Sequence, residues 1–112
     1  MEIYKILLLS EWNFFEETGK SDGSAIDLTD GYIHFSTAKQ LRETVQKHFK
    51  TVSEFELLAC DSKSFKKNIK WEPSRGGDLF PHLYRQLLFS DVKWHVTLKL
   101  GALGYEFPTH IE

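Results

Sequence analysis

Short apolar runs of strand length recur along the chain, and only two segments carry the periodicity of a helix. Residues 3–9 and 54–61 are apolar runs of strand length, and residues 92–100 alternate apolar and polar side chains. Residues 32–35 and 69–72 add two shorter strands. Short strands interspersed with helices, without a regular strand–helix alternation, favour an α+β fold over a doubly wound parallel sheet.

The two helical segments have recognisable ends. Ser10 is the expected N-cap of the first helix, and Gly19 is its expected C-terminal stop. Thr37 and Gln40 form a Thr-x-x-Gln capping box at the start of the second helix, and an apolar stripe at helical spacing follows them. The small and polar segment 19–24 predicts a loop.

Size and composition limit the classes of protein to which the chain can belong. Its 112 residues suit one domain, residues 1–112, with an irregular tail from about residue 101. Fourteen basic and sixteen acidic residues give a net charge of −2, which provides no general attraction to nucleic acid. Cys60 is the only cysteine, and no signal peptide precedes the first strand, which indicates the reducing cytoplasm. No apolar stretch approaches membrane-spanning length, so we expect a soluble cytoplasmic domain without a membrane partner.

The stretch GYIHFST places polar side chains where a strand meets a helix. His34 alternates with Ile33 and Phe35, so it points to the opposite face of the strand from both. Ser36 and Thr37 follow immediately before the helix. A ligand at such a junction would meet an imidazole, a hydroxyl and the positive end of a helix. The simpler interpretation of the two hydroxyls is that they only cap the helix.

The stretch KWEPSRGGDLFPHLYRQ has the mixed composition of a binding loop. Glu72 leaves a strand beside Trp71, and the proline that follows holds Glu72 in an extended conformation. Ser74 and Arg75 then offer a hydroxyl and a guanidinium. Arg75 can hold a phosphate or a carboxylate with two hydrogen bonds.

The same stretch continues with two glycines and a histidine among aromatic residues. Gly76 and Gly77 can take positive φ, so their backbone N–H groups can face an anion. His82 and Tyr84 return close by in the chain, but no Lys-Ser/Thr follows the glycines, which excludes a P-loop. The alternative is a structural turn with an exposed arginine and a surface histidine, and the density of chemically active side chains favours a site.

These observations define two groups of candidate residues and one spatial expectation. The candidates for acid–base catalysis are His34, Glu72 and His82. The candidates for ligand binding are Ser36, Thr37, Trp71, Ser74, Arg75, Gly76, Gly77 and Tyr84. We expect one cleft to collect His34, Ser36, Glu72, Arg75 and His82. The histidines show no metal-ligand spacing such as His-x-x-x-His, so we predict no metal site.

The stretches DGYIHFST and WEPSRGGDLFPHLY together resemble the family catalogued as domain of unknown function 952, a group of small and mostly bacterial proteins. The resemblance covers nearly the whole chain up to residues 92–100, and it departs from the usual pattern at Arg85, where a small residue is commoner. It implies a compact relative of the ADP-ribosyltransferase fold, in which two antiparallel sheets with two to three short helices surround an NAD-binding cleft.

The resemblance also implies roles for the candidate residues. It implies that His34 and Ser36 hold the nicotinamide ribose of NAD, and that Glu72 orients the nucleophile and stabilises an oxocarbenium-like transition state. RNA 2′-phosphotransferases share the fold and handle phosphate with arginine and histidine, which Arg75 and His82 resemble. A small phosphate-containing ligand and a phosphorylated RNA end are therefore the implied partners. Such analogy from fold alone does not establish a function.

Three functions remain open from the sequence. The first is an NAD- or nucleotide-dependent transferase or hydrolase, with Arg75 on phosphate and with Glu72 and His82 as acid–base groups. The second is a non-catalytic binder of a nucleotide or another small anion in the same cleft. The third is an interaction module whose aromatic and glycine loop docks a partner protein.

Overall fold

A computed structural model describes residues 1–102, 104–109 and 111, and for Arg75 it describes the backbone alone. The elements occur in the order β1 (Glu2–Leu8), α1 (Leu9–Thr18), β2 (Lys20–Ser21), α2 (Ala25–Asp30), β3 (Ile33–His34), α3 (Ala38–His48), β4 (Glu54–Asp61), η1 (Ser62–Asn68), β5 (Ile69–Pro73), η2 (Arg75–Gly77), β6 (Leu79–Leu83), β7 (Leu87–Leu88), η3 (Phe89–Asp91), β8 (Val92–Gly101) and β9 (Gly104–Tyr105), where η denotes a 3₁₀ helix.

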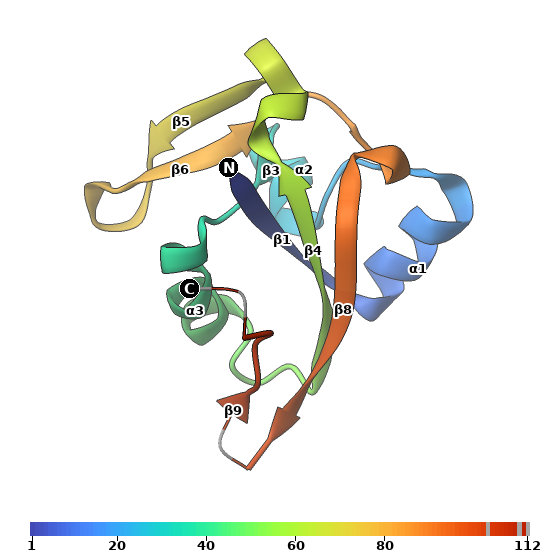
Figure 1. The fold of residues 1–112 in the computed structure, drawn as a ribbon, viewed down its shortest axis with the longest axis vertical. Helices are drawn as coiled ribbons and strands as arrows, with labels where there is room; N and C mark the ends of the chain where they lie inside the picture. The colour runs from blue at the N-terminus through green and yellow to red at the C-terminus, as the bar shows by residue number, and fades with distance from the viewer. Residues whose placement is uncertain (103, 110, 112) are drawn as a thin grey trace.

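The strands form antiparallel sheets of three sizes in the part of the chain that the structure describes (Figure 1). The long sheet has the order β1–β4–β8–β9, and the smaller sheet has the order β3–β6–β5. Strands β2 and β7 form a separate two-stranded sheet, which is an addition to the two sheets expected from the sequence. The expected α+β class with mostly antiparallel sheets is confirmed.

The two larger sheets meet where β1 lies beside the end of β3. Tyr4 and Ser36 exchange two backbone hydrogen bonds of 2.8 Å each. This bridge places the segment that follows His34 against the edge of the long sheet. Side chains from both sheets can therefore line one pocket.

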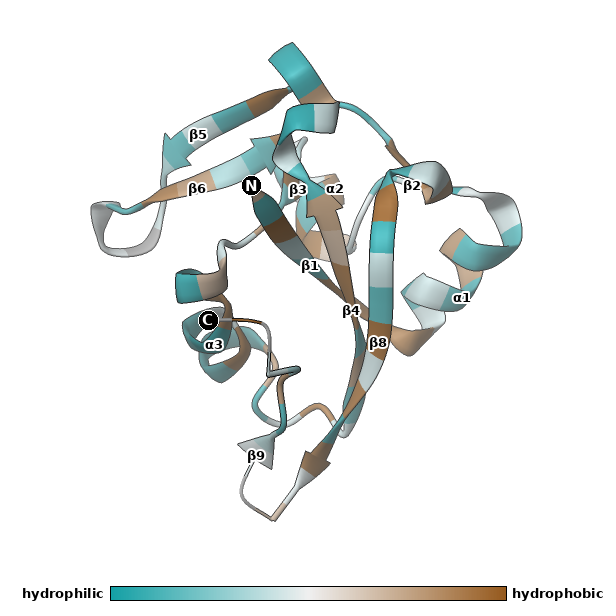
Figure 2. Ribbon diagram, in the orientation of Figure 1, coloured by the Kyte–Doolittle hydropathy of each residue, from teal (hydrophilic) through white to brown (hydrophobic). Residues whose placement is uncertain are grey.

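Apolar side chains cover both faces of β1 and β4, which explains why these strands are near-continuous apolar runs in the sequence. On one face Ile3 and Leu7 belong to a cluster with Phe15 of α1. On the other face Ile6 belongs to a cluster with Leu41 of α3. Figure 2 shows mostly hydrophobic residues along the upper part of β4 and alternating bands along β8. Helices α1 and α3 thus cover opposite faces of the long sheet (Figure 1).

Two helix ends follow the predicted chemistry. Gly19 has a φ of 79° and ends α1, a conformation that costs glycine little because it has no Cβ. At the start of α3, Thr37 Oγ1 accepts the backbone N–H of Gln40 at 3.3 Å, and the Gln40 side chain accepts the N–H of Thr37 at 3.0 Å. The capping box predicted from the sequence is confirmed.

Two other helix predictions were wrong. Helix α1 begins before Ser10, with Leu8 at the N-cap position, because the Glu11 side chain accepts the N–H of Leu8 at 2.8 Å. Helix α2 was missed, since six residues are too few to show helical periodicity. It begins where the Asp27 side chain accepts the N–H of Ser24 at 2.8 Å.

The end of the chain contains one short strand where an irregular tail was expected. Strand β9 pairs with the end of β8, with Leu100 opposite Tyr105. The Tyr105 hydroxyl donates to the backbone carbonyl of Phe49 at 3.2 Å, which ties this segment to the end of α3. Within the described residues, no helix has the length and apolar character needed to cross a bilayer.

We predict that Thr37→Ala lowers the free energy of unfolding by about 1 kcal/mol, because the first turn of α3 loses its side-chain cap. The measurement is the urea unfolding midpoint followed by circular dichroism. Thr51→Ala is the matched control, since Thr51 is exposed and should change stability by less than about 0.5 kcal/mol. Equal losses in the two variants would contradict a capping role for Thr37.

Candidate functional site

The smaller sheet brings the two sequence motifs together on one of its faces. His34 of β3 lies opposite His82 of β6, and His82 lies opposite Lys70 of β5. Directly opposed residues of an antiparallel pair point to the same face, so these three side chains form a row across the sheet. The rings of His34 and His82 lie edge to face with their centroids 5.3 Å apart.

Glu72 holds the ring of His82 from the neighbouring strand. Its Oε1 lies 2.9 Å from Nδ1 of His82 and accepts a 2.6 Å hydrogen bond from the hydroxyl of Tyr84. The hydrogen bonds from Tyr84 and from His82 lower the pKa of Glu72, so at neutral pH its carboxylate carries no proton. Nδ1 of His82 is therefore the donor in this pair. The same carboxylate raises the pKa of Tyr84 to about 12.

The other ring nitrogen of His82, Nε2, is left as a hydrogen-bond acceptor when the ring is neutral. His82 is 2% exposed, and no described residue makes a hydrogen bond to Nε2. Tyr32 covers the ring, with a centroid distance of 4.3 Å and 29° between the planes. An unsatisfied buried acceptor costs roughly 1–3 kcal/mol, and because Nε2 has almost no exposed surface, a donor reaches it only after a neighbouring side chain moves.

His34 is held differently, between two carboxylates of α2. Oδ1 of Asp27 lies 2.5 Å from Nδ1 of His34 and also accepts the backbone N–H of His34 at 3.1 Å. Oδ2 of Asp30 lies 3.1 Å from Nε2 of His34. The contact with Asp27 is a hydrogen bond, whereas the contact with Asp30 is within ion-pair distance only. The two neighbouring histidines therefore differ in their carboxylate contacts.

Asp27 is the buried anion behind His34. Its residue exposure is 1%, and its Oδ2 lies 2.5 Å from Nζ of Lys5, which is itself buried on β1. Burial acts to raise the pKa of Asp27, but the hydrogen bond from His34 and the charge of Lys5 outweigh it and lower the pKa to about 2. The charges of this cluster are compensated within the protein.

Tyr32 connects the two histidines through ring contacts. Its ring centroid lies 4.6 Å from that of His34 and 5.2 Å from that of Tyr84. Burial, followed by the charges of Asp30 and Glu72, raises the pKa of Tyr32. We call Tyr32, His34, His82 and Tyr84 the ring cluster.

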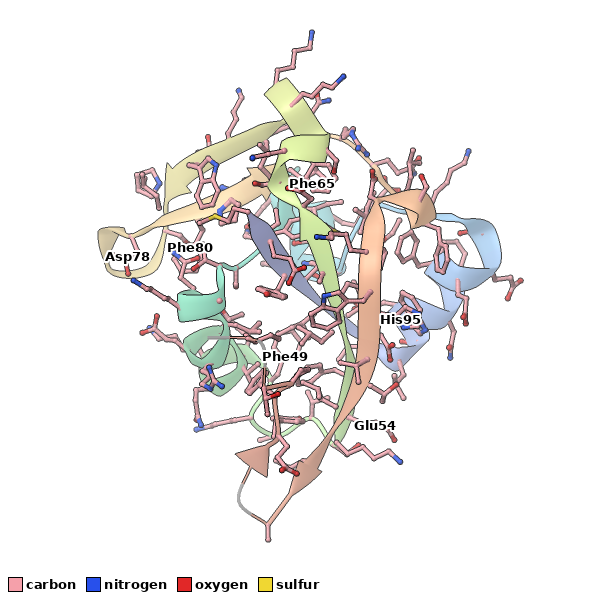
Figure 3. All side chains as sticks on the ribbon, viewed as in Figure 1. Phe49, Glu54, Phe65, Asp78, Phe80 and His95 are labelled. Atoms are coloured by element: carbon pink, nitrogen blue, oxygen red, sulfur yellow. The ribbon has the colours of Figure 1, made fainter. Side chains whose placement is uncertain are left out.

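A pocket of about 510 Å³ opens beside His34 and His82. Its polar groups next to the two histidines include Asp30. Phe80 of β6 and Phe49 at the end of α3 contribute to its apolar wall (Figure 3). Its volume lies within the range of roughly 300–1,000 Å³ that is usual for small-molecule sites.

The hydroxyl groups of Ser36 and Thr37 make their hydrogen bonds with residues of helix α3. Ser36 lines the pocket but is 5% exposed, and its hydroxyl lies 2.9 Å from that of Thr44. Thr44 donates its own proton to the carbonyl of Gln40 at 3.1 Å, so Ser36 is the donor to Thr44. Thr37 is the N-cap of α3. These contacts favour the simpler interpretation of the two hydroxyls.

The glycine turn lies at the tip of the β5–β6 hairpin, where Figure 3 labels Asp78. Gly76 and Gly77 have φ values of 66° and 86°, so both use the freedom that glycine has. The N–H of Gly77 donates to the carbonyl of Ser74 at 2.9 Å, which commits it to the turn. Ser74 lines the pocket, whereas the side chain of Arg75 lies outside the described part of the structure.

Trp71 and Tyr84 differ in their relation to the site. By strand alternation Trp71 points to the face of β5 opposite to that of Lys70 and Glu72, and it is 38% exposed. Tyr84 belongs to the ring cluster and holds Glu72, as described above. Its ring also lies beneath Nζ of Lys70, 4.9 Å from the ring centroid.

Arg85 is bound within the protein. Its guanidinium donates to both carboxylate oxygens of Asp91, at 2.9 and 3.0 Å. It also lies 4.9 Å from the ring centroid of Phe65. This side chain therefore has a structural role in the loop that follows β6.

Sequence reasoning missed Lys5, Asp27 and Tyr32. Lys5 carried a signal, because it is a single charge within an apolar strand and a buried lysine requires an anion. Asp27 carried no such signal, since helix α2 was not predicted, and Tyr32 was expected only as the first residue of a short strand.

Another histidine–carboxylate pair lies away from the pocket. Nδ1 of His95 lies 2.6 Å from Oε2 of Glu56, and the hydroxyl of Thr97 donates to Oε1 of Glu56 at 2.5 Å. The His95 ring packs against Trp12 of α1, on the α1 side of the sheet (Figure 3). In the part of the chain that the structure describes, no group of three or more His, Cys, Asp and Glu side chains could hold a metal ion.

The fold and the site define an α+β protein whose pocket adjoins two different histidine–carboxylate pairs. The chain belongs to the family described as "Protein of unknown function (DUF952)", whose family model matches residues 6–95. The membership predicted from the two motifs is thereby confirmed.

Two solved structures of one bacterial relative resemble this chain closely. The crystal structure of protein CC0527 from Caulobacter crescentus has a TM-score of 0.92 and 43% sequence identity, covering 99% of this chain and 98% of that chain. The solution NMR structure of CC0527 has a TM-score of 0.83 and 45% identity, covering 93% of this chain and 90% of that chain. The comparison with curated proteins gives no match.

We predict that Asp27→Asn lowers the free energy of unfolding by about 3–5 kcal/mol at neutral pH, because Lys5 and His34 lose their buried counter-charge. Thermal or urea unfolding measures the loss. Asp78→Asn is the matched control, since Asp78 is exposed at the hairpin tip. A loss below about 1 kcal/mol would contradict the role given to Asp27.

We predict that the free energy of unfolding decreases in acid as the Asp27 carboxylate is protonated. The pKa of Asp27 is lowered from 3.8 to about 2 on folding, so its stabilising effect is complete above pH 3.8 and is lost as the pH falls toward 2. The expected size of this step is roughly 2 kcal/mol. Urea titrations between pH 5 and pH 2 should show the step in the natural protein and not in Asp27→Asn.

Proposed function

We propose that the protein is a transferase or hydrolase that acts on a nucleotide, with His82 as the proton acceptor and NAD as the first ligand to test. The observation that carries the proposal is Nε2 of His82, a buried acceptor that no described residue satisfies. Glu72 fixes the tautomer by accepting the proton of Nδ1. A histidine so oriented can take a proton from a hydroxyl group or from water once a side-chain movement exposes Nε2.

The pocket has the chemistry that a nucleoside requires. Apolar side chains such as Ile6, Phe35 and Phe80 line it and suit a planar base or a nicotinamide ring. His82 and Asp30 line it as well, and both are acceptors suited to ribose hydroxyls. Ribose is therefore expected beside the two histidines, with the base against the apolar wall.

The resemblance to ADP-ribosyltransferases supports NAD as the ligand, and it gives His34 and Ser36 a role on the nicotinamide ribose. The hydroxyl of Ser36 donates to Thr44, so His34 is the stronger candidate for that contact. Arg75 follows Ser74, which lines the pocket, and is the candidate for binding phosphate. A phosphorylated RNA end is a second ligand of the same chemistry. No metal is required by this proposal.

A non-catalytic binder is the second candidate function. The observation that favours it is the pairing of both ring nitrogens of His34 with carboxylates, which leaves that residue committed within the protein. Such a protein would bind a nucleotide in the same pocket without turning it over. An interaction module remains a third candidate, since Trp71 and Leu79 are exposed on the β5–β6 hairpin.

We predict that His82→Asn lowers turnover far more than it lowers binding. Removing a general base typically lowers the rate by roughly 10²–10⁴-fold, whereas removing one neutral hydrogen bond weakens binding by about 2- to 10-fold. The measurements are a titration with NAD followed by amide shifts in NMR spectra, and product formation followed by chromatography. His95→Asn is the control, because His95 also bonds a carboxylate but lies away from the pocket.

Binding without turnover in the natural protein would assign it to the non-catalytic binders. No binding of NAD, ADP-ribose or a phosphorylated RNA end at millimolar concentration would end the nucleotide proposal and leave the interaction module. Glu72→Gln should reproduce part of the His82→Asn defect, since the amide can still contact Nδ1 but bears no charge.

We predict that Arg75→Ala weakens binding of the phosphate-containing ligand by roughly 10- to 100-fold, because a charged hydrogen bond to phosphate is lost. Stability should change little, since Arg75 lies at the tip of a hairpin. Isothermal titration with NAD or ADP-ribose measures the change, and Arg42→Ala on α3 is the control. A variant that unfolds would instead assign Arg75 a structural role.

A further inference from the structure

We propose that His34 and His82 form an acid–base couple that cleaves a phosphate ester of a ribonucleotide. This inference rests on the proposed function, because it requires that a nucleotide binds in the pocket, and it names the bond that breaks. The two histidines are adjacent, yet each has a different carboxylate environment.

The two environments assign opposite roles to the two rings. His82 has one carboxylate, Glu72, on Nδ1, and no described residue satisfies its Nε2, so the neutral ring can accept a proton there. His34 has a carboxylate oxygen beside each ring nitrogen, so each nitrogen faces an acceptor when it carries a proton. Neighbouring groups whose environments favour opposite protonation states are the usual arrangement of a catalytic base and acid.

The charged and titratable groups around the couple come from three elements and from Tyr32, which lies between α2 and β3. The groups that face His34 are Asp27 and Asp30 from α2, with Lys5 of β1 on the far oxygen of Asp27. The groups that face His82 are Glu72 and Lys70 of β5 and the hydroxyl-bearing ring of Tyr32. Asp30 is 37% exposed at its side chain, so a substrate oxygen can displace it from Nε2 of His34.

The proposed step is balanced in protons and bonds. Nε2 of His82 accepts the proton of a water or a ribose hydroxyl while that oxygen attacks phosphorus. The bond from phosphorus to the departing oxygen breaks, and Nε2 of His34 gives its proton to that oxygen. The couple ends with its protonation states exchanged, and transfer through solvent restores them. No oxidant, reductant or metal takes part.

A proton donor next to the base favours the cleavage of some bonds over others. An alkoxide is a poor leaving group, so cleavage of a phosphate ester gains from a proton donor. Nicotinamide leaves NAD as a neutral molecule and needs no such proton. A positive ring near the reacting centre also favours the extra negative charge of a phosphoryl transition state over an oxocarbenium ion. The couple therefore fits a phosphate ester better than a glycosidic C–N bond.

Lys70 gives an independent reason to expect phosphate at this face of the sheet. It lies in the same row as His34 and His82, on the neighbouring strand β5. Lys70 is exposed, and its ammonium lies over the exposed ring of Tyr84, outside the lining of the pocket. A lysine in that position can turn toward a phosphate oxygen.

The test uses 2′,3′-cyclic AMP as the probe, with NAD in a parallel reaction. We expect the natural protein to open the cyclic phosphate to a nucleoside monophosphate, which ³¹P NMR detects. We expect a bell-shaped dependence of kcat/KM on pH, which is typical of an acid and a base that act together.

Substitutions at three positions of the site test the couple, and a substitution of His95 is the control. His82→Asn and His34→Asn should each lower kcat by roughly 10²–10⁴-fold, and the double variant should lose little more, because the residues act as one unit. Asp30→Asn keeps the Asp27 contact, so it should fold even if His34→Asn does not. It should change kcat while the fold is kept, since it alters only the contact to Nε2 of His34. His95→Asn should leave the profile unchanged.

Failure of this inference and failure of the proposed function have different signatures. Release of nicotinamide from NAD with an intact cyclic phosphate would overturn the ester-cleaving couple and keep the proposed function. Turnover of 2′,3′-cyclic AMP at an undiminished rate in both Asp30→Asn and His34→Asn would overturn the role of His34 alone. Absence of any binding by NAD and by 2′,3′-cyclic AMP would overturn both.

Discussion

The buried carboxylate of Asp27 is the interaction on which the arrangement of the site depends. It accepts hydrogen bonds from the backbone of Ser24 and from the backbone and ring of His34, and it pairs with Lys5. These partners come from β1, from the start of α2 and from β3, so one anion connects three segments. A buried charge is tolerated only when such bonds replace its hydration. The position of His34 therefore follows from the need to satisfy Asp27.

The two faces of the smaller sheet divide packing from chemistry. Ile33 and Leu83 lie on one face, within the apolar cluster that contains Phe15 of α1. His34 and His82 lie on the other face, where the pocket opens. The apolar face is closely packed, so the strands can move little relative to one another. The histidines on the opposite face are therefore held at a defined separation.

Much of this arrangement was predictable from local patterns. The strands at β1, β4 and β8, the Thr37 capping box and the end of α1 at Gly19 all follow from the sequence. The meeting of the two motifs at His34 and His82 was expected, and Glu72 joins them there. Helix α2 was not predictable, because a helix of six residues is specified by its capping contacts and its packing rather than by periodicity.

The sequence by itself determined the α+β class, the family and the residue types available for chemistry, because periodicity, caps and motifs are properties of neighbouring residues. Only the tertiary structure decided what each polar side chain faces. Ser36 became a partner of helix α3, and His34 acquired a carboxylate on each nitrogen. His82 acquired one carboxylate and kept a buried nitrogen that no described residue satisfies. The hydrogen-bonding state of an imidazole depends on atoms that lie far away in the chain, and long-range strand pairing alone brings those atoms within reach.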